Sequence, residues 1–241
     1  MATLTLFSES GSGGSLCDGI ASRTAVNEVF STIRSGNGTA ADATQNQELV
    51  RLTSSGTINQ FAGLYRYFIS FSIPNLGGGV VTGAYLRLFG GSSPTGLGSA
   101  DLHVAGASMA TANNVISSDF QNRQTTSFGS ITRANYNTTA SVPNDLIFNS
   151  TGIASIASNS TLELSLQLSW DILNSFTGTW AASTDTYFTF FTSDILSSSP
   201  ELAPRLVIVL SLGEGLRSQG FHPSWVGSLL RPRQFAPGRA K

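Results

Sequence analysis

Short runs of alternating hydrophobic and polar residues recur along the first 212 residues of the chain. In the clearest run, TLELSLQLSW (residues 161–170), four leucines and Trp170 alternate with polar side chains. A second run, LYRYFISFSIP (64–74), places aromatic residues and isoleucines on one face and Arg66 with two serines on the other, until Pro74 interrupts it. This period of two predicts half-buried antiparallel strands.

Further short strands are expected at 2–7, 27–33, 48–53, 84–88, 100–107, 186–193 and 205–212. A glycine-rich link joins the run at 64–74 to the strand at 84–88, and we expect these two strands to pair. Residues 113–120 and 151–158 are each expected to form a turn or two of helix. Roughly eight to ten strands predict an all-β protein, an antiparallel, jelly-roll-like β-sandwich over residues 1–212.

Composition agrees with a folded domain whose surface carries little charge. Hydrophobic residues make up 40% of the 241 residues, which supports a sizeable core, whereas charged residues make up only 11%. Cys17 is the single cysteine, which excludes an intrachain disulfide and a cysteine metal site. We find no basic leader followed by an apolar stretch and no run of 18 apolar residues, so we expect neither signal-peptide export nor membrane insertion.

The alternation stops after Leu212, and residues 213–241 are predicted to form an extended basic docking tail. Residues 1–212 hold 8 basic and 13 acidic side chains, whereas residues 213–241 hold 5 basic and 1 acidic. Ordering such a segment costs about 1–2 kcal/mol per residue in backbone entropy. Burial of its large apolar side chains offsets about 1.5–3 kcal/mol each, so we expect the tail to require a partner surface. The predicted docking residues are Trp225, Leu229, Leu230, Arg231, Arg233, Phe235 and Arg239.

The tail favours a protein partner. Its charges alternate with proline, glycine and large apolar groups, a mixture that suits a protein groove better than a phosphate backbone. The opposite net charge of residues 1–212 makes a neighbouring subunit or a second copy of the chain a natural target. We therefore expect a homo-oligomer, with no nucleic acid and no membrane among the partners.

The chain shows no pattern typical of catalysis. His103 lies in an alternating strand, and His222 lies in the tail beside Pro223. The aspartates are spread singly over turns, where this residue commonly completes backbone hydrogen bonds, with calcium coordination by some pair of them as the alternative. We expect no catalytic residue, cofactor or metal. Tyr136 and Trp180 lie in loop-like regions where they could stack on a glycan, with core packing as the alternative.

One stretch resembles a known family. In LYRYFISFSIPNLGGGVVTGAYLRLFG (64–90), residues Arg66, Phe71, Ile73, Leu76, Ala84, Leu86 and Leu88 follow the pattern of DNRLRE-type β-sandwich domains, which are similar to carbohydrate-binding modules. PELAPRLVIVL (200–210) is similar to the last strand of that family, although Pro204 and Arg205 stand in inverted order. The resemblance covers roughly residues 25–212 and implies a sandwich fold and a carbohydrate-binding type of surface.

The end of the chain resembles a second group. Arg233, Phe235, Pro237, Gly238, Ala240 and Lys241 fit the R-x-F-x-P-G-x-A-R/K segment with which bacteriophage structural proteins often finish. This resemblance implies a non-enzymatic virion protein, either a head decoration (cement) protein or a fibre component, with capsid or tail subunits as partners. The alternative is a carbohydrate-binding or adhesive module that is extracellular or at a cell surface, and a polysaccharide-degrading enzyme is the weakest of the three hypotheses.

Overall fold

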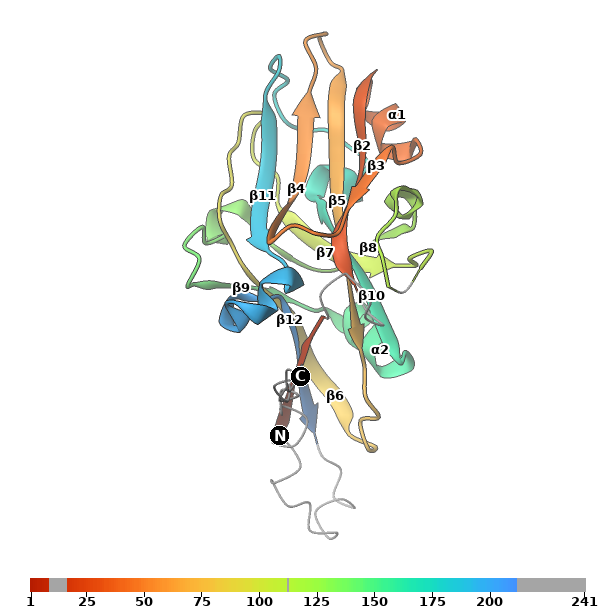
Figure 1. Cartoon of the computed structure of the whole chain (residues 1–241), viewed down its shortest axis with the longest axis vertical. Coiled ribbons are helices and arrows are strands. Elements are labelled where there is room, and N and C mark those ends of the chain that lie inside the picture. Colours follow the sequence, from red (N-terminus) through yellow and green to blue (C-terminus); the bar gives the residue numbers. More distant parts are fainter. Residues whose placement is uncertain (9–16, 112, 212–241) are drawn as a thin grey trace, which may run out of the picture.

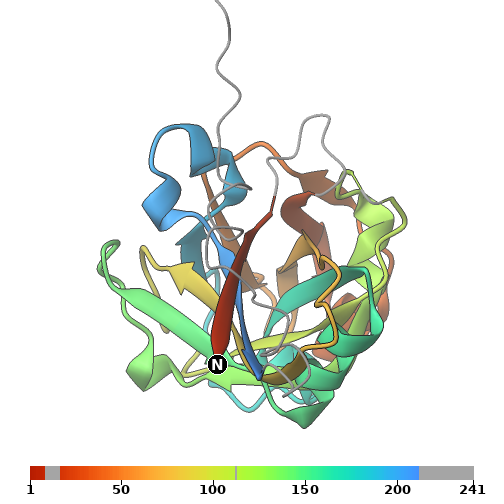
Figure 2. The same cartoon turned by 90° about the horizontal axis from the view of Figure 1, so that it is seen from below.

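Two antiparallel sheets pack face to face, which confirms the predicted β-sandwich. The computed structural model describes residues 1–8, 17–111 and 113–211. The smaller sheet has the strand order β1 (Ala2–Phe7), β12 (Arg205–Ser211), β6 (Val80–Phe89) and β9 (Pro143–Ile147). Figure 1 shows β1, β12 and β6 extending below the other strands, and Figure 2 looks at the molecule from that end.

The larger sheet has eight strands. Its main path runs through β11 (Asp185–Phe191), β4 (Gln47–Ser54), β5 (Phe61–Ser72), β10 (Thr161–Leu168), β7 (Leu102–Ala107) and β8 (Arg123–Ile131). Off this path, β2 (Asp18–Glu28) pairs with β5, and β3 (Ala40–Asp42) pairs with β2.

Strand β5 is the spine of the larger sheet. One edge of it pairs with β2, from Phe61 to Ile69. The other edge pairs first with β4, over 61–65, and then with β10, over 67–72. Arg66 therefore lies where the neighbour of β5 changes from β4 to β10. Three parts of the chain that are distant in sequence meet around this residue.

The interior is more completely covered than a half-buried pattern implies. Ser165 and Gln167 of β10, expected on a polar face, are both fully buried, as is Arg66 of β5. Gln167 Nε2 donates to the carbonyl oxygen of Gln124 and to Ser165 Oγ, so its amide nitrogen is hydrogen-bonded inside the protein. The prediction that this face of the two strands is exposed to solvent is wrong, because loops and helices cover the outer side of the larger sheet.

Short helices join the strands. They are α1 (Phe30–Ser35), α2 (Ser150–Ser158) and α3 (Ser169–Ile172), with the 3-10 turns η1 (Ser117–Gln121), η2 (Arg133–Asn135), η3 (Ser193–Ser197) and η4 (Pro200–Leu202). Helix α2 begins where the side chain of Asn149 accepts hydrogen bonds from the amides of Thr151 and Gly152. Both predicted helical stretches are confirmed in kind, at η1 and α2.

The strand predicted at 27–33 is wrong. Strand β2 ends at Glu28, which pairs with Phe61 at the start of β5, so no neighbouring strand remains beyond that point. The chain turns instead into α1, which places Ile33 in the core with no exposed surface. Likewise Trp170, expected at the end of a strand, belongs to the helical turn α3, although it is buried as predicted.

The expected pairing of residues 64–74 with residues 84–88 is also wrong. Strand β5 belongs to the larger sheet, whereas β6 lies in the smaller sheet between β12 and β9. The glycine-rich link (74–79) crosses from one layer to the other, and Gly77 and Gly78 adopt positive φ angles there. The described residues contain twelve strands, more than the roughly eight to ten predicted. The strands that the sequence does not predict are β2, β3, β8 and β9, which show no clear alternation of apolar and polar residues.

The core should respond to truncation in the way that a tightly packed sandwich does. Leu164 lies in the middle of β10 with no exposed surface, so Leu164→Ala should lower the free energy of unfolding by about 2–5 kcal/mol. Ile147 on β9 is 71% exposed, and Ile147→Ala should change it by less than about 0.5 kcal/mol. Urea denaturation measures both, and equal effects would contradict this description of the core.

Candidate functional site

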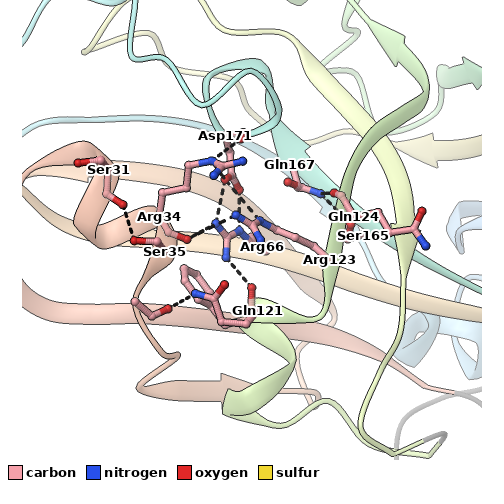
Figure 3. A network of polar contacts seen from close by, with 12 residues as sticks. Ser31, Arg34, Ser35, Arg66, Gln121, Arg123, Gln124, Ser165, Gln167 and Asp171 are labelled. Atoms are coloured by element: carbon pink, nitrogen blue, oxygen red, sulfur yellow. Dashed lines mark hydrogen bonds and ion pairs between the residues drawn. The ribbon is translucent and has the colours of Figure 1, made fainter.

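Three arginines surround one aspartate beneath the outer surface of the larger sheet. We call Arg34, Arg66, Arg123 and Asp171 the guanidinium cluster (Figure 3). Arg66 Nε donates to Asp171 Oδ2 at 2.6 Å, and Arg66 Nη2 donates to Asp171 Oδ1 at 2.8 Å. This is the two-point geometry for which a guanidinium and a carboxylate are matched. Neither side chain is exposed by more than 1%.

The elements around β5 bring the four residues together. Arg66 comes from β5, Asp171 from α3 directly after β10, Arg34 from α1 and Arg123 from the start of β8. Arg66 also donates from Nη2 to the carbonyl oxygen of Arg34 at 2.9 Å and from Nη1 to the carbonyl oxygen of Phe120. Its guanidinium lies 3.8 Å from the centre of the Phe120 ring. The cluster thus joins α1, η1, β8 and α3 to the spine of the sheet.

The positive charges outnumber the negative charge in this cluster. Arg34 Nε lies 3.2 Å and Arg123 Nε 3.6 Å from Asp171 Oδ1. Burial by itself raises the pKa of Asp171, but the charge and hydrogen bonds of Arg66, helped by the other two arginines, outweigh it and hold that pKa below its usual value. Burial lowers the pKa of Arg66 to about 10, so the guanidinium stays charged at neutral pH.

A second set of buried polar side chains includes Asp18 and Glu48. Asp18 of β2 accepts hydrogen bonds from the Tyr67 hydroxyl and from the Ser193 amide, the latter at 2.7 Å. Glu48 of β4 is 5% exposed, and its Oε1 has no hydrogen-bond partner among the described residues. Burial, followed by the negative charges of neighbouring aspartates with Asp42 first, raises the pKa of Glu48 to about 8. Within the described ranges, no group of three His, Cys, Asp or Glu side chains is arranged to hold a metal ion.

The two predicted glycan contacts have different environments. Tyr136 is 7% exposed; its hydroxyl donates to the Thr189 carbonyl oxygen at 2.7 Å, and its ring packs edge-on against Phe188. Tyr136 therefore presents no stacking face to solvent in this structure, as in the packing alternative. Trp180 is partly buried against the core, and its Nε1 donates to the Gln60 carbonyl oxygen at 3.0 Å. The residues that contact Tyr136 differ from those that contact Trp180, so these contacts do not place the two side chains in one site.

His103 is a strand residue, as expected. Its Nδ1 lies 2.9 Å from Ser127 Oγ, and burial lowers the pKa of its ring.

The structure also contains a surface groove of about 450 Å³ between the link after β5 and the end of α2. Leu76 and Ile156 line it together with backbone and small polar groups. No helix within the described part of the chain is long and apolar enough to cross a membrane.

The predicted docking residues lie outside the described residues. Trp225, Leu229, Leu230, Arg231, Arg233, Phe235 and Arg239 all follow Ser211, the last residue of β12.

The guanidinium cluster is the feature that sequence reasoning missed. The resemblance drew attention to Arg66, but Arg34, Arg123 and Asp171 stood in no recognisable motif. Asp171 follows Trp170 at the end of the strongest alternating run, which is the one local signal that could have pointed to it. Nothing local indicates its contact with Arg66, 105 residues earlier.

Comparison with known proteins identifies no family for this sandwich. No family model matches the chain, and no curated protein matches it. A search of solved structures finds a virus structure, described as the structure of infectious bursal disease virus Gx strain, with 13% identity and a TM-score of 0.16. That match covers 88% of this chain and 61% of the virus chain. So low a score carries no argument, and both resemblances stated above stay predictions.

Removing the single carboxylate of the cluster should be strongly destabilising. Asp171→Asn leaves three guanidinium groups without a counter-charge in the interior, and we expect it to lower the free energy of unfolding by about 3–5 kcal/mol. The matched control is Asp185→Asn, because Asp185 Oδ2 lies 3.9 Å from Arg51 Nη1 and both side chains are about a third exposed. Such an exposed pair contributes about 0–1 kcal/mol. Comparable losses in chemical denaturation would contradict the role given to Asp171.

Glu48 should make the protein less stable as the pH rises. Between pH 4.5, the ordinary pKa of a glutamate, and about 8, the folded protein keeps a proton on Glu48 that the unfolded chain has released. The free energy of unfolding should therefore fall across this window, by at most ~1.4 kcal/mol per pH unit. Glu48→Gln should remove most of that decline, whereas Glu201→Gln, at an exposed position, should preserve it. Thermal denaturation from pH 5 to pH 8 measures the difference.

Proposed function

We propose that this chain is a non-enzymatic bacteriophage virion protein, a head decoration or fibre component, in which the β-sandwich is a rigid body and residues 213–241 bind neighbouring capsid or tail subunits. The observation that supports the proposal most directly is the position of β12, the last strand before residues 213–241, within the smaller sheet. Strand β12 pairs with β1 on one side and with β6 on the other, and it ends at Ser211 opposite Val80. The segment that follows therefore starts from a firmly held strand at one tip of the molecule (Figure 1).

The distribution of charge supports attachment through this segment. Residues 213–241 hold 5 basic side chains and 1 acidic one, in contrast to the acidic excess of residues 1–212. Three arginines and the single lysine lie within the last eleven residues. Opposite charges steer association and suppress wrong partners, so an acidic surface on a neighbouring subunit is the expected target.

Repetition on a symmetric particle would make weak individual contacts sufficient. Once one copy is bound, its neighbours in an oligomer present their tails at high effective concentration, so the combined attachment exceeds any single affinity. A rigid sandwich favours this arrangement because it holds the tail origins at fixed separations. The buried polar contacts of the guanidinium cluster are one source of that rigidity.

Deletion of residues 213–241 should separate folding from assembly. We expect the truncated protein to keep the sandwich, because both sheets and the core lie within the described residues before 212. It should no longer incorporate into particles made in a lysate that lacks the full chain. Purified particles, probed by mass spectrometry, would measure incorporation, and circular dichroism would measure folding.

A substitution set tests the same point without shortening the chain. Replacing Arg231, Arg233 and Arg239 by glutamine should reduce incorporation, whereas Arg51→Gln, a change on the sandwich itself, should not. Normal incorporation of the truncated protein would overturn the proposal. Glycan-array binding by the sandwich, lost on replacing Trp180, would favour the carbohydrate-binding alternative instead.

A further inference from the structure

The guanidinium cluster holds more positive charge than its own carboxylate can neutralise. Asp171 is the one carboxylate that contacts Arg34, Arg66 or Arg123 within the described part of the chain. Two of the three positive charges are therefore formally unbalanced. Taking charged groups out of water costs several kcal/mol each unless a counter-charge or hydrogen bonds compensate, so such a surplus needs an explanation.

Within the described residues, the side-chain oxygens of Asp171 accept hydrogen bonds from Arg66 alone. The two oxygens of the carboxylate accept the bidentate pair at 2.6 and 2.8 Å. The short hydrogen bond of Arg34 Nε, at 2.7 Å, goes instead to the backbone carbonyl of Asp171. Arg123 Nη2 is 3.5 Å from the carbonyl oxygen of Arg34, and Arg123 Nε is buried without a hydrogen-bond partner. The surplus charge thus belongs to Arg34 and Arg123.

These two guanidinium groups are close together on the outer side of the cluster. Their Nε atoms lie 3.2 and 3.6 Å from the same oxygen, Asp171 Oδ1, and are therefore at most 6.8 Å apart. The side chain of Arg34 is 13% exposed and that of Arg123 is 7% exposed, whereas that of Arg66 has no exposed surface. Figure 3 shows them on either side of Asp171. Of the three arginines, the two that carry the surplus charge are therefore the ones whose side chains retain exposed surface.

We propose that Arg34 and Arg123 bind a small free oxyanion, of the phosphate or sulfate class, at the outer side of the guanidinium cluster. Guanidinium groups bind such anions through paired N–H donors. An anion bound between Arg34 and Arg123 supplies a second negative charge for the cluster. Arg66 and Asp171 form the buried base that keeps Arg34 and Arg123 in place. The site is independent of the function proposed for the tail.

Sodium phosphate and sodium sulfate serve as the probes, with sodium chloride at equal ionic strength as the reference. A ligand that binds only the folded protein raises the melting temperature with its concentration, and at about ten times the Kd we expect a rise of about 3–5 °C in the full chain. Isothermal titration calorimetry with phosphate should give one site per chain. Sodium acetate in a third series tests whether a planar carboxylate is accepted.

Variants separate this site from the general stabilising effect of sulfate and phosphate on proteins. Arg123→Gln and Arg34→Gln should each lose the saturable part of the rise, measured relative to each variant's own melting temperature in chloride. Arg87→Gln removes the same charge at a partly exposed position on β6 of the smaller sheet and should respond as the unmodified chain does. If Arg123→Gln does not fold, the more exposed Arg34→Gln and Arg34→Lys carry the test.

The outcomes decide the proposal in either direction. A saturable rise that Arg34→Gln abolishes, with one phosphate bound per chain, supports the site. An equal response of all variants, or no heat of binding to the unmodified chain at millimolar phosphate, overturns it.

Discussion

The buried pair of Arg66 and Asp171 is the contact on which the arrangement of this sandwich depends. Arg66 lies where one edge of β5 passes from β4 to β10, and Asp171 lies in the helical turn that directly follows β10. Their two hydrogen bonds therefore fix the end of one strand against the middle of another, 105 residues away. A hydrophobic pair of similar volume would avoid the desolvation cost of two buried charges, but it would not select one relative position of the strands so strictly. The specificity of the Arg66–Asp171 pair is the property that offsets this cost.

The same burial has consequences for the residues around the pair. Once Asp171 is committed to Arg66, the carbonyl oxygens of Arg34 and Phe120 are needed to complete the hydrogen bonds of the Arg66 guanidinium. Helix α1 and the turn η1 are thereby attached to the outer side of the larger sheet. Arg34 and Arg123 lie close to a carboxylate whose single charge is already paired with Arg66, so positive charge accumulates at the margin of the cluster. The proposed anion site follows from this arrangement, because the Arg66–Asp171 contact leaves the charges of Arg34 and Arg123 without a carboxylate of their own.

Sequence reasoning reached the fold but not its connections. β10, which alternates strictly, and β12, a continuous apolar run, were predicted nearly to their ends because each pattern is typical of a buried strand. Strand β2 has a bulge between Thr24 and Glu28, with Ala25 at a positive φ of 56°, and this irregularity erased its pattern. The pairing of β5 with β6 failed because short links in sandwiches often cross between layers. Asp171 was not predicted because contacts across 105 residues leave no local pattern. The loop position of Tyr136 left glycan stacking and core packing both open, and its contact with Phe188 corresponds to packing.

The smaller sheet explains how a sandwich of this kind could carry a load through its last strand. β12 is paired with β1 over six residue pairs, Ala2 to Phe7, and with β6 over seven, Val80 to Arg87. A force applied along β12 would load the hydrogen bonds of both ladders together. An edge strand would be held by one ladder alone. Because β12 has a neighbour on both sides, its topology is compatible with the attachment that we propose for residues 213–241.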